Sequence, residues 1–262
     1  MSANTAGALL MMLSMSAFVV NDLFLKLTGG ALPLFQLIFV RGILATLLIY
    51  GIARCTGGLL SGISGRDQAL IALWGIAEIG TAYFFLTALF NMPIGNLSAI
   101  MQVAPLTVTL ASLVFLGETV GWRRMLAILI GFAGVVLIIR PGVDGFNIWS
   151  LYALAAVLGV TLRDMVTRQL SVGVPGMTVT LGTTLAVTLA AGLASLTQPY
   201  APITPPLAGS IVASALFVSI GYFASVQAMR TGAVSFVAPF RYSGLVAAML
   251  AGFLCLAKSP RG

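Results

Sequence analysis

Long apolar stretches, separated by short connections rich in glycine, proline and serine, are the dominant pattern along the chain. A helix needs about 20 mostly apolar residues to cross a membrane. Nine stretches meet this requirement, and the predicted spans are 6–26, 33–53, 69–90, 96–116, 122–139, 148–169, 176–196, 206–229 and 233–256. No connection is long enough to hold a soluble domain. The pattern therefore predicts an all-α, polytopic membrane protein.

Composition removes most other classes of function. Hydrophobic residues make up 60% of the 262 residues and charged residues only 7%, against about 25% charged residues in soluble domains. Histidine is absent, which excludes histidine metal ligands and a Ser-His-Asp triad. The chain also lacks the GxxxxGKS/T phosphate loop and the HExxH and GxGD motifs. We therefore expect neither an enzyme nor a bound cofactor or metal.

The positive charge is spread along the chain, which fits a lipid bilayer better than a nucleic-acid partner, and lysine and arginine favour the cytoplasmic side of membrane proteins. With a cytoplasmic N-terminus, the inner side carries Arg54, Arg66, Arg123, Arg124, Arg168 and Arg230. The outer side then carries Lys26, Arg140, Lys258 and Arg261. We expect a multi-pass protein of the inner membrane with its N-terminus in the cytoplasm.

The two halves of the sequence are related by a repeat. Asp22, Lys26 and Pro33 recur 142 residues later as Asp164, Arg168 and Pro175. Residues 95–116 resemble residues 235–256 at an offset of 140. Five spans separate the copies, so the copies are inverted in the membrane, as they are in many secondary transporters. The repeat predicts two units, 1–142 with spans one to five and 143–262 with spans six to nine.

Several short motifs occur in the same order in a known family. They are Pro33 with Arg41, the run Ala99-Ile-Met-Gln-Val-Ala-Pro105, Gly117-Glu118, Gly131, Gly134-Val135, Pro141-Gly142 and the run Ala238-Pro239-Phe240-Arg241-Tyr242. With these motifs the chain resembles the drug/metabolite transporter superfamily, specifically its EamA-type ten-helix carriers. The resemblance implies two inverted five-helix repeats and the export of amino acids and related metabolites. A weaker likeness, in Met12-Leu-Ser-Met-Ser-Ala-Phe with Asn21-Asp22, is to riboflavin-type carriers.

The end of the chain departs from the family pattern. At the offset of 140, Lys258 stands where Glu118 stands in the first half, and the family carries one more helix after this point. The tenth helix is therefore expected to be missing here, by truncation, frameshift or native design. Span 122–139 would then lack its repeat partner, so we expect a functional form to carry a tenth span after Leu256.

Three charges are predicted to lie near the middle of the membrane. With a rise of about 1.5 Å per residue, Arg41 lies about 12 Å below the outer surface. Glu78 and Arg241 lie about 14 and 12 Å above the inner surface. In a core about 30 Å thick these depths allow Glu78 to pair with either arginine. The interpretations are a substrate-binding cluster or an ion pair that only locks helices together, and both stay open.

Aromatic and amide side chains in spans three, four, eight and nine are further candidates for substrate binding. They are Trp74, Tyr83, Gln102, Tyr222, Gln227 and Tyr242. In a cavity between the repeats they would supply stacking faces and hydrogen bonds. Ordinary packing between helices is the alternative for each aromatic. Gln102 and Tyr242 are the stronger candidates because they are polar, occupy equivalent repeat positions and lie three residues from a proline.

The two repeated aspartates are not expected to share a proton. Inversion leaves Asp22 and Asp164 about 18 Å apart along the membrane normal, whereas a carboxylate dyad needs contact. Each is expected to pair with the base four residues later, Lys26 or Arg168.

The sequence thus predicts a secondary transporter that moves a small organic metabolite by alternating access. An amino acid or related compound, exported, is the first hypothesis for the substrate, and riboflavin uptake is the second. A membrane assembly subunit that transports nothing is the alternative from another class. Proton coupling is left open, and Glu78, Asp22 and Asp164 are the acids that could serve in it.

Overall fold

The computed structural model describes residues 2–56, 62–117 and 147–248, and scattered residues between 121 and 133. These parts of the chain are helical and contain no strand. The helices are α1 (Ala3–Leu27), α2 (Leu34–Thr56), α3 (Gly65–Asn91), α4 (Ile94–Met101), α5 (Ala104–Phe115), α7 (Ile148–Gln169), α8 (Gly176–Ser195), α9 (Pro205–Thr231), α10 (Val234–Val237) and the 3-10 helix η1 (Ala238–Tyr242).

Seven of the predicted spans correspond to helices that are long and apolar enough to cross a membrane. They are α1, α2, α3, the pair α4–α5, α7, α8 and α9. A shorter apolar helix, Val234–Ala248, begins the ninth predicted span. Most of span 122–139, and everything after residue 248, lie outside the described residues. The chain is therefore a multi-pass helical membrane protein, while nine spans, the missing tenth helix and the two-unit division remain predictions.

Side-chain caps fix where several helices begin. The hydroxyl of Ser2 accepts a hydrogen bond from the backbone N–H of Thr5, 3.2 Å away, at the start of α1. Ser64 does the same for Asp67, at 3.1 Å, before α3. Asn147 and Ser150 form a reciprocal capping box at the start of α7. These polar side chains satisfy backbone N–H groups that have no partner within the helix.

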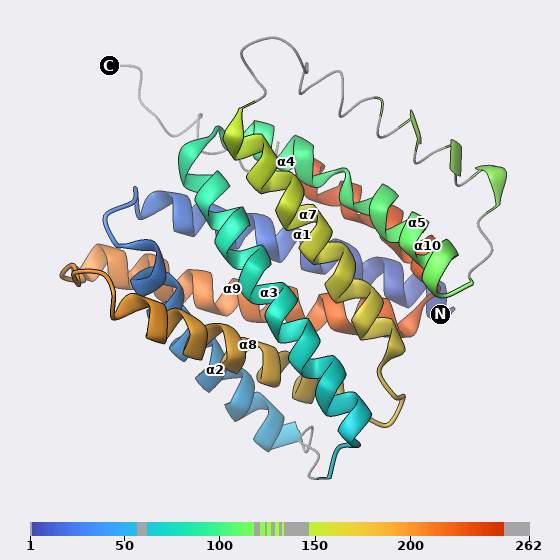
Figure 1. The fold of residues 1–262 in the computed structure, drawn as a ribbon, viewed down its shortest axis with the longest axis horizontal. Coiled ribbons are helices and arrows are strands. Elements are labelled where there is room, and N and C mark those ends of the chain that lie inside the picture. The colour runs from blue at the N-terminus through green and yellow to red at the C-terminus, as the bar shows by residue number, and fades with distance from the viewer. Residues whose placement is uncertain are drawn as a thin grey trace.

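Three helix pairs make the most extensive contacts between helices (Figure 1). Helix α1 lies along α9, α3 lies along α7, and α2 lies along α8. Each pair joins one helix from before residue 142 to one from after it. The hydroxyl of Ser14 on α1 donates a hydrogen bond of 2.8 Å to the carbonyl of Gly221 on α9, which shows how close the first pair lies. The core is therefore built mainly between the two parts of the chain.

Two helices are interrupted within the bundle. Helix α4 ends at Met101 and α5 begins at Ala104, with a turn between them. Helix α10 passes at Ala238 into the 3-10 helix η1. Pro105 and Pro239 stand at these breaks, and proline lacks the N–H that a continuous helix uses. The proline positions singled out in the sequence therefore coincide with real breaks.

Small residues let paired helices approach closely. A Cβ atom on Gly42 of α2 would lie 2.3 Å from Oγ1 and 3.1 Å from Cβ of Thr188 on α8. A Cβ atom on Gly159 of α7 would lie 2.1 Å from Oγ1 of Thr81 on α3. Such contacts between small residues are a main source of helix association in lipid.

We predict that Gly42→Ala lowers the unfolding free energy by about 1–3 kcal/mol, because the added methyl group overpacks the contact with Thr188. Gly51→Ala on the same helix is the matched control, since a Cβ atom at Gly51 meets nothing within 4 Å. The control should gain up to about 1 kcal/mol from helix propensity. Thermal unfolding in detergent measures both, and equal effects of the two substitutions would contradict the packing account.

Candidate functional site

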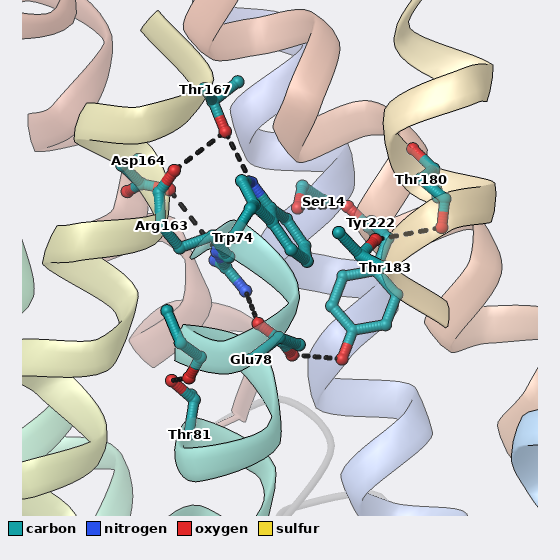
Figure 2. A network of polar contacts seen from close by, with 12 residues as sticks. Ser14, Trp74, Glu78, Thr81, Arg163, Asp164, Thr167, Thr180, Thr183 and Tyr222 are labelled. Atoms are coloured by element: carbon teal, nitrogen blue, oxygen red, sulfur yellow. Dashed lines mark hydrogen bonds and ion pairs between the residues drawn. The ribbon is translucent and has the colours of Figure 1, made fainter. Parts of the chain in front are cut away.

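Four buried charged residues form a continuous chain of ion pairs in the middle of the bundle. Figure 2 shows three of them, Glu78, Arg163 and Asp164. Arg163 Nη1 lies 3.1 Å from Glu78 Oε2, and Arg163 Nε lies 3.5 Å from Asp164 Oδ1. Asp164 Oδ2 in turn accepts a hydrogen bond from Arg241. Every side chain is at most 6% exposed. We call Glu78, Arg163, Asp164 and Arg241 the ion-pair chain.

Aromatic side chains hold the ion-pair chain in place. Tyr222 on α9 donates its hydroxyl hydrogen to Glu78 Oε1. The guanidinium carbon of Arg163 lies 5.5 Å from the ring centre of Trp74, a cation–π contact. The indole N–H of Trp74 donates to Thr167 Oγ1 over 2.7 Å, and that hydroxyl donates to the carbonyl of Arg163 over 2.9 Å. Figure 2 places Arg163 between these groups, so its orientation is fixed from several helices.

A second polar group centres on Asn21 of α1. Arg41 Nη1 donates to Asn21 Oδ1 over 3.3 Å, and Ser214 Oγ donates to the same oxygen over 2.7 Å. Asn21 Nδ2 donates to Asp22 Oδ1 over 2.9 Å. Arg41 is 7% exposed and Asn21 is 3% exposed. The amide therefore connects a buried arginine to a carboxylate without direct contact between the two charges.

Both polar groups face a cavity of about 170 Å³. Its lining comes from α1, α2, α3, α4, α5, α7, α9 and η1, so both parts of the chain contribute. The charged lining residues are Asp22, Arg41, Glu78, Arg163 and Arg241. Apolar walls are formed by Met15, Phe18, Phe85, Leu97, Met101 and Val218, among others. An apolar cavity with a few convergent polar groups is the usual form of a small-molecule site.

A smaller space of about 20 Å³ adjoins this cavity and shares Arg41, Glu78 and Tyr222 with it. Its other wall is α8, where Thr183, Thr184 and Thr188 bond to carbonyls of their own helix. The space is large enough for about one water molecule.

The predicted site residues divide into two sets. Glu78, Arg41, Arg241, Gln102 and Tyr222 line the main cavity. Trp74, Tyr83, Gln227 and Tyr242 are not among its lining residues.

The second set has other surroundings. Trp74 lies behind Arg163, as described above. Tyr83 is 37% exposed and stacks on Phe35, with 6.1 Å between the ring centres. Gln227 packs against Gly176 at the start of α8. The buried hydroxyl of Tyr242 has no hydrogen-bond partner among the described residues.

The predicted charge pairs are wrong in detail. Glu78 pairs with Arg163 instead of Arg41 or Arg241, and Arg241 pairs with Asp164. Asp164 does not pair with Arg168. Its two carboxylate oxygens are instead paired with the adjacent Arg163 and with Arg241 of η1.

The bases near the ends of α1 and α7 contact backbone carbonyls. Lys26 donates to the carbonyls of Leu89 and Met92 at the end of α3, over 2.8 and 3.0 Å. Arg168 donates to the carbonyl of Met229 near the end of α9, over 3.4 Å. Cations favour the C-terminal ends of helices, where carbonyls lack partners. This explains why spacing along one helix did not determine the partners of Asp22 and Asp164.

Three residues that matter to the geometry were missed from the sequence: Arg163, Asn21 and Ser214. A signal was present for two of them. Arg163 stands 142 residues after Asn21, so the repeat that relates Asp22 to Asp164 also relates these neighbours. A base at that depth of a span is a strong indication of a buried partner. Ser214 gave no signal, since single serines are frequent in membrane helices.

The described residues hold no group of three or more histidine, cysteine, aspartate or glutamate side chains that could bind a metal ion. The carboxylates of the two polar groups, Asp22, Glu78 and Asp164, are engaged by arginine, tyrosine or asparagine. The arrangement is therefore suited to binding and releasing a solute through hydrogen bonds and charge, with no group placed for bond-breaking chemistry.

Relatives of known name are transporters. The chain is 27% identical to a riboflavin transporter of Vibrio cholerae over 71% of this chain and 63% of the relative. It is 28% identical to the pseudopaline exporter of Pseudomonas aeruginosa, over 63% of this chain and 58% of that protein. The chain is 23% identical to an S-adenosylmethionine uptake transporter of Rickettsia bellii, over 95% of this chain and 84% of that protein. The chain thus matches about three fifths of the length of the first two relatives.

A solved crystal structure has the same fold, with a TM-score of 0.78 and 19% identity. The match covers 98% of this chain and 91% of the other. The sequence model of the EamA-like transporter family matches residues 5–140, which are more than half of the 262 residues. A transporter family agrees with the prediction that the chain is not an enzyme. The chain belongs to the EamA-like transporter family.

Proposed function

We propose that the protein is a secondary transporter that moves a small organic metabolite across the inner membrane by alternating access. The observation that carries the proposal is the cavity of about 170 Å³ between the two parts of the chain, with buried charges on its wall. Charges inside a membrane protein are costly and usually mark a substrate or ion pathway. Broken helices border this cavity, and such helices typically form the binding sites of secondary transporters.

Inverted repeats are part of the proposal, and two features support them. In an inverted repeat, α1, α2 and α3 are equivalent to α7, α8 and α9. Exchanging equivalent helices turns the pair α1–α9 into the pair α7–α3 and leaves the pair α2–α8 unchanged. These are the three main helix pairs, so the observed packing has the symmetry of the repeat. Thr46 Oγ1 and Thr188 Oγ1 lie 3.4 Å apart and are 142 residues apart in sequence, the offset of the repeat. Equivalent residues meet at a twofold axis, so this contact fits an axis between α2 and α8.

An amino acid or a related compound is the proposed substrate class. An engineered apolar cavity of about 150 Å³ holds benzene, so a cavity of about 170 Å³ suits a single ring or a branched side chain. The tricyclic ring system of riboflavin is larger, which makes a riboflavin-type carrier the second candidate. It is kept because a relative is named a riboflavin transporter. The apolar walls with charges of both signs suit a solute with an apolar side chain and a charged head group.

Orientation, direction and coupling complete the proposal. Arginine and lysine placement favours a cytoplasmic N-terminus, and the family resemblance favours export. A proton is the proposed coupling ion, with Glu78 as its carrier, because Glu78 is the acid that lines both spaces. The charged and titratable groups lining the same two spaces are Asp22, Arg41, Arg163, Tyr222 and Arg241. An assembly subunit without transport is disfavoured, because nothing in that role requires a cavity with buried charges on its wall.

Counterflow in proteoliposomes tests the function. We expect vesicles containing the protein and loaded with unlabelled amino acids to accumulate labelled leucine or methionine, while empty vesicles do not. Riboflavin is tested in parallel. Riboflavin counterflow without amino-acid counterflow would favour the second candidate. Absence of counterflow for every solute, with correctly inserted protein, would contradict the transport proposal.

Glu78→Gln tests the proton role. The substitution keeps the shape of the side chain and leaves Arg163 paired only with Asp164. We expect the variant to insert and to bind solute, but to lose proton-driven flux or its dependence on pH between about 5 and 8. Ser98→Ala is the control, because Ser98 lines the same cavity without charge. A folded Glu78→Gln protein whose flux and pH dependence match the wild type would remove Glu78 from the mechanism.

A further inference from the structure

The charges around the cavity fall into two groups with different pairing. Each member of the ion-pair chain has a direct partner of opposite charge. Arg41 and Asp22 have none within the described residues, and each makes a single hydrogen bond, to Asn21. Both line the cavity. The charges of the ion-pair chain are therefore compensated within the protein, whereas Arg41 and Asp22 can still form ion pairs and hydrogen bonds with a ligand.

The amide of Asn21 indicates what kind of ligand matches the second group. Its oxygen accepts from Arg41 at 3.3 Å, and its nitrogen donates to Asp22 at 2.9 Å. A zwitterionic head group offers the same two functions in the same order: a carboxylate that accepts from arginine, and an ammonium that donates to aspartate. The two charges are therefore spaced for one small group that is an acceptor at one end and a donor at the other.

The repeat makes the difference between the groups more specific. Asn21 and Asp22 occupy the positions that Arg163 and Asp164 occupy 142 residues later. In the second copy a positive charge bridges the acids Glu78 and Asp164. In the first copy a neutral amide bridges a base and an acid. Because the amide carries no charge, it leaves the charges of Arg41 and Asp22 uncompensated by any direct ion pair.

We propose that Arg41 and Asp22 form the recognition site for a zwitterionic head group, and that the ion-pair chain is the scaffold beside it. The proposal rests on the transport function proposed above. Arg41 binds the carboxylate of the solute and Asp22 binds its ammonium group. Arginine has five N–H donors and a carboxylate accepts about four hydrogen bonds, so both retain capacity after bonding to Asn21. The apolar wall of Phe18, Phe85 and Met101 receives the side chain of the solute.

The charge balance of the site favours a net-neutral solute. Three arginines and three acids make up the two groups, so the site is neutral when all are ionised. A solute with a single charge would leave a net charge in surroundings of low dielectric, where charge is poorly screened. A zwitterion adds one charge of each sign, and each lies opposite its complement.

Binding to the detergent-purified full chain tests the proposal through matched ligands. The probes are L-leucine and L-methionine, each compared with the amine that lacks its carboxylate and the acid that lacks its amine. For leucine these are 3-methylbutylamine and 4-methylpentanoate. We expect each amino acid to bind at least about tenfold more tightly than either analogue, since each loses one charge-assisted contact. Equal binding of all three probes, or binding of none, would overturn the proposal.

Two variants assign the contacts to their residues. Asp22→Asn should abolish the preference for leucine over 4-methylpentanoate and keep the preference over 3-methylbutylamine. Arg41→Gln should abolish the preference for leucine over 3-methylbutylamine and keep the preference over 4-methylpentanoate. A purely structural role would lower binding of all probes together, as we expect for Arg163→Gln. Gly51→Ala lies on the same helix as Arg41 but outside the cavity lining, so it is the control and should keep both preferences. If both variants keep both preferences, the assignment is wrong.

Counterflow with the same variants separates this proposal from the transport function. The expected binding pattern without flux in vesicles would contradict transport and support the recognition site. Flux of leucine in the wild type together with unchanged selectivity in both variants would support transport and overturn the recognition site. Unfolding temperatures of the purified variants, measured without ligand, identify any variant that failed to fold. If a variant fails to fold, the binding of the matched ligands to the wild-type protein decides whether the site recognises a zwitterion.

Discussion

A charge buried in the membrane must find an opposite charge or a hydrogen-bonding partner, and Arg163 is where this constraint acts most strongly. Its guanidinium group contacts Glu78 on α3 and Asp164 on its own helix, and it lies over the ring of Trp74. Arg241 completes the chain from η1. The helices on both sides of residue 142 are thereby held in one relative position, and the cavity beside them follows from it.

The helices that surround the cavity are not uniform. Glycines such as Gly42 and Gly159 allow close contact between paired helices, while the helices α4–α5 and α10–η1 are interrupted near Pro105 and Pro239. Charges on the wall then divide into those satisfied by the protein and those joined only through Asn21. A transporter requires both parts: a rigid framework, and groups that exchange their partners when a solute binds.

The sequence predicted the helical membrane class and nine spans, of which seven correspond to described helices, because hydrophobic length identifies a span. The depths of the central charges stay predictions. The sequence did not predict the partners, because depth says nothing about how a helix is rotated about its axis. Tyr83 and Glu78 lie on the same helix, yet Tyr83 is 37% exposed and Glu78 is 3% exposed. Arg163 was missed for the same reason. The repeat placed it beside Asp164, but only packing shows that it faces α3.

A double-mutant cycle on Glu78 and Arg163 tests the central claim most directly, through the unfolding free energy in detergent. Either single substitution, Glu78→Gln or Arg163→Gln, should be destabilising by up to about 3–5 kcal/mol, because it removes one partner of a buried ion pair. Arg163 then keeps only Asp164 as a charged partner, and Glu78 keeps only the hydroxyl of Tyr222. The double variant should be destabilised by less than the sum, with a coupling energy of about 0.5–3 kcal/mol. Strictly additive effects would mean that the two charges do not depend on each other, and would contradict the account.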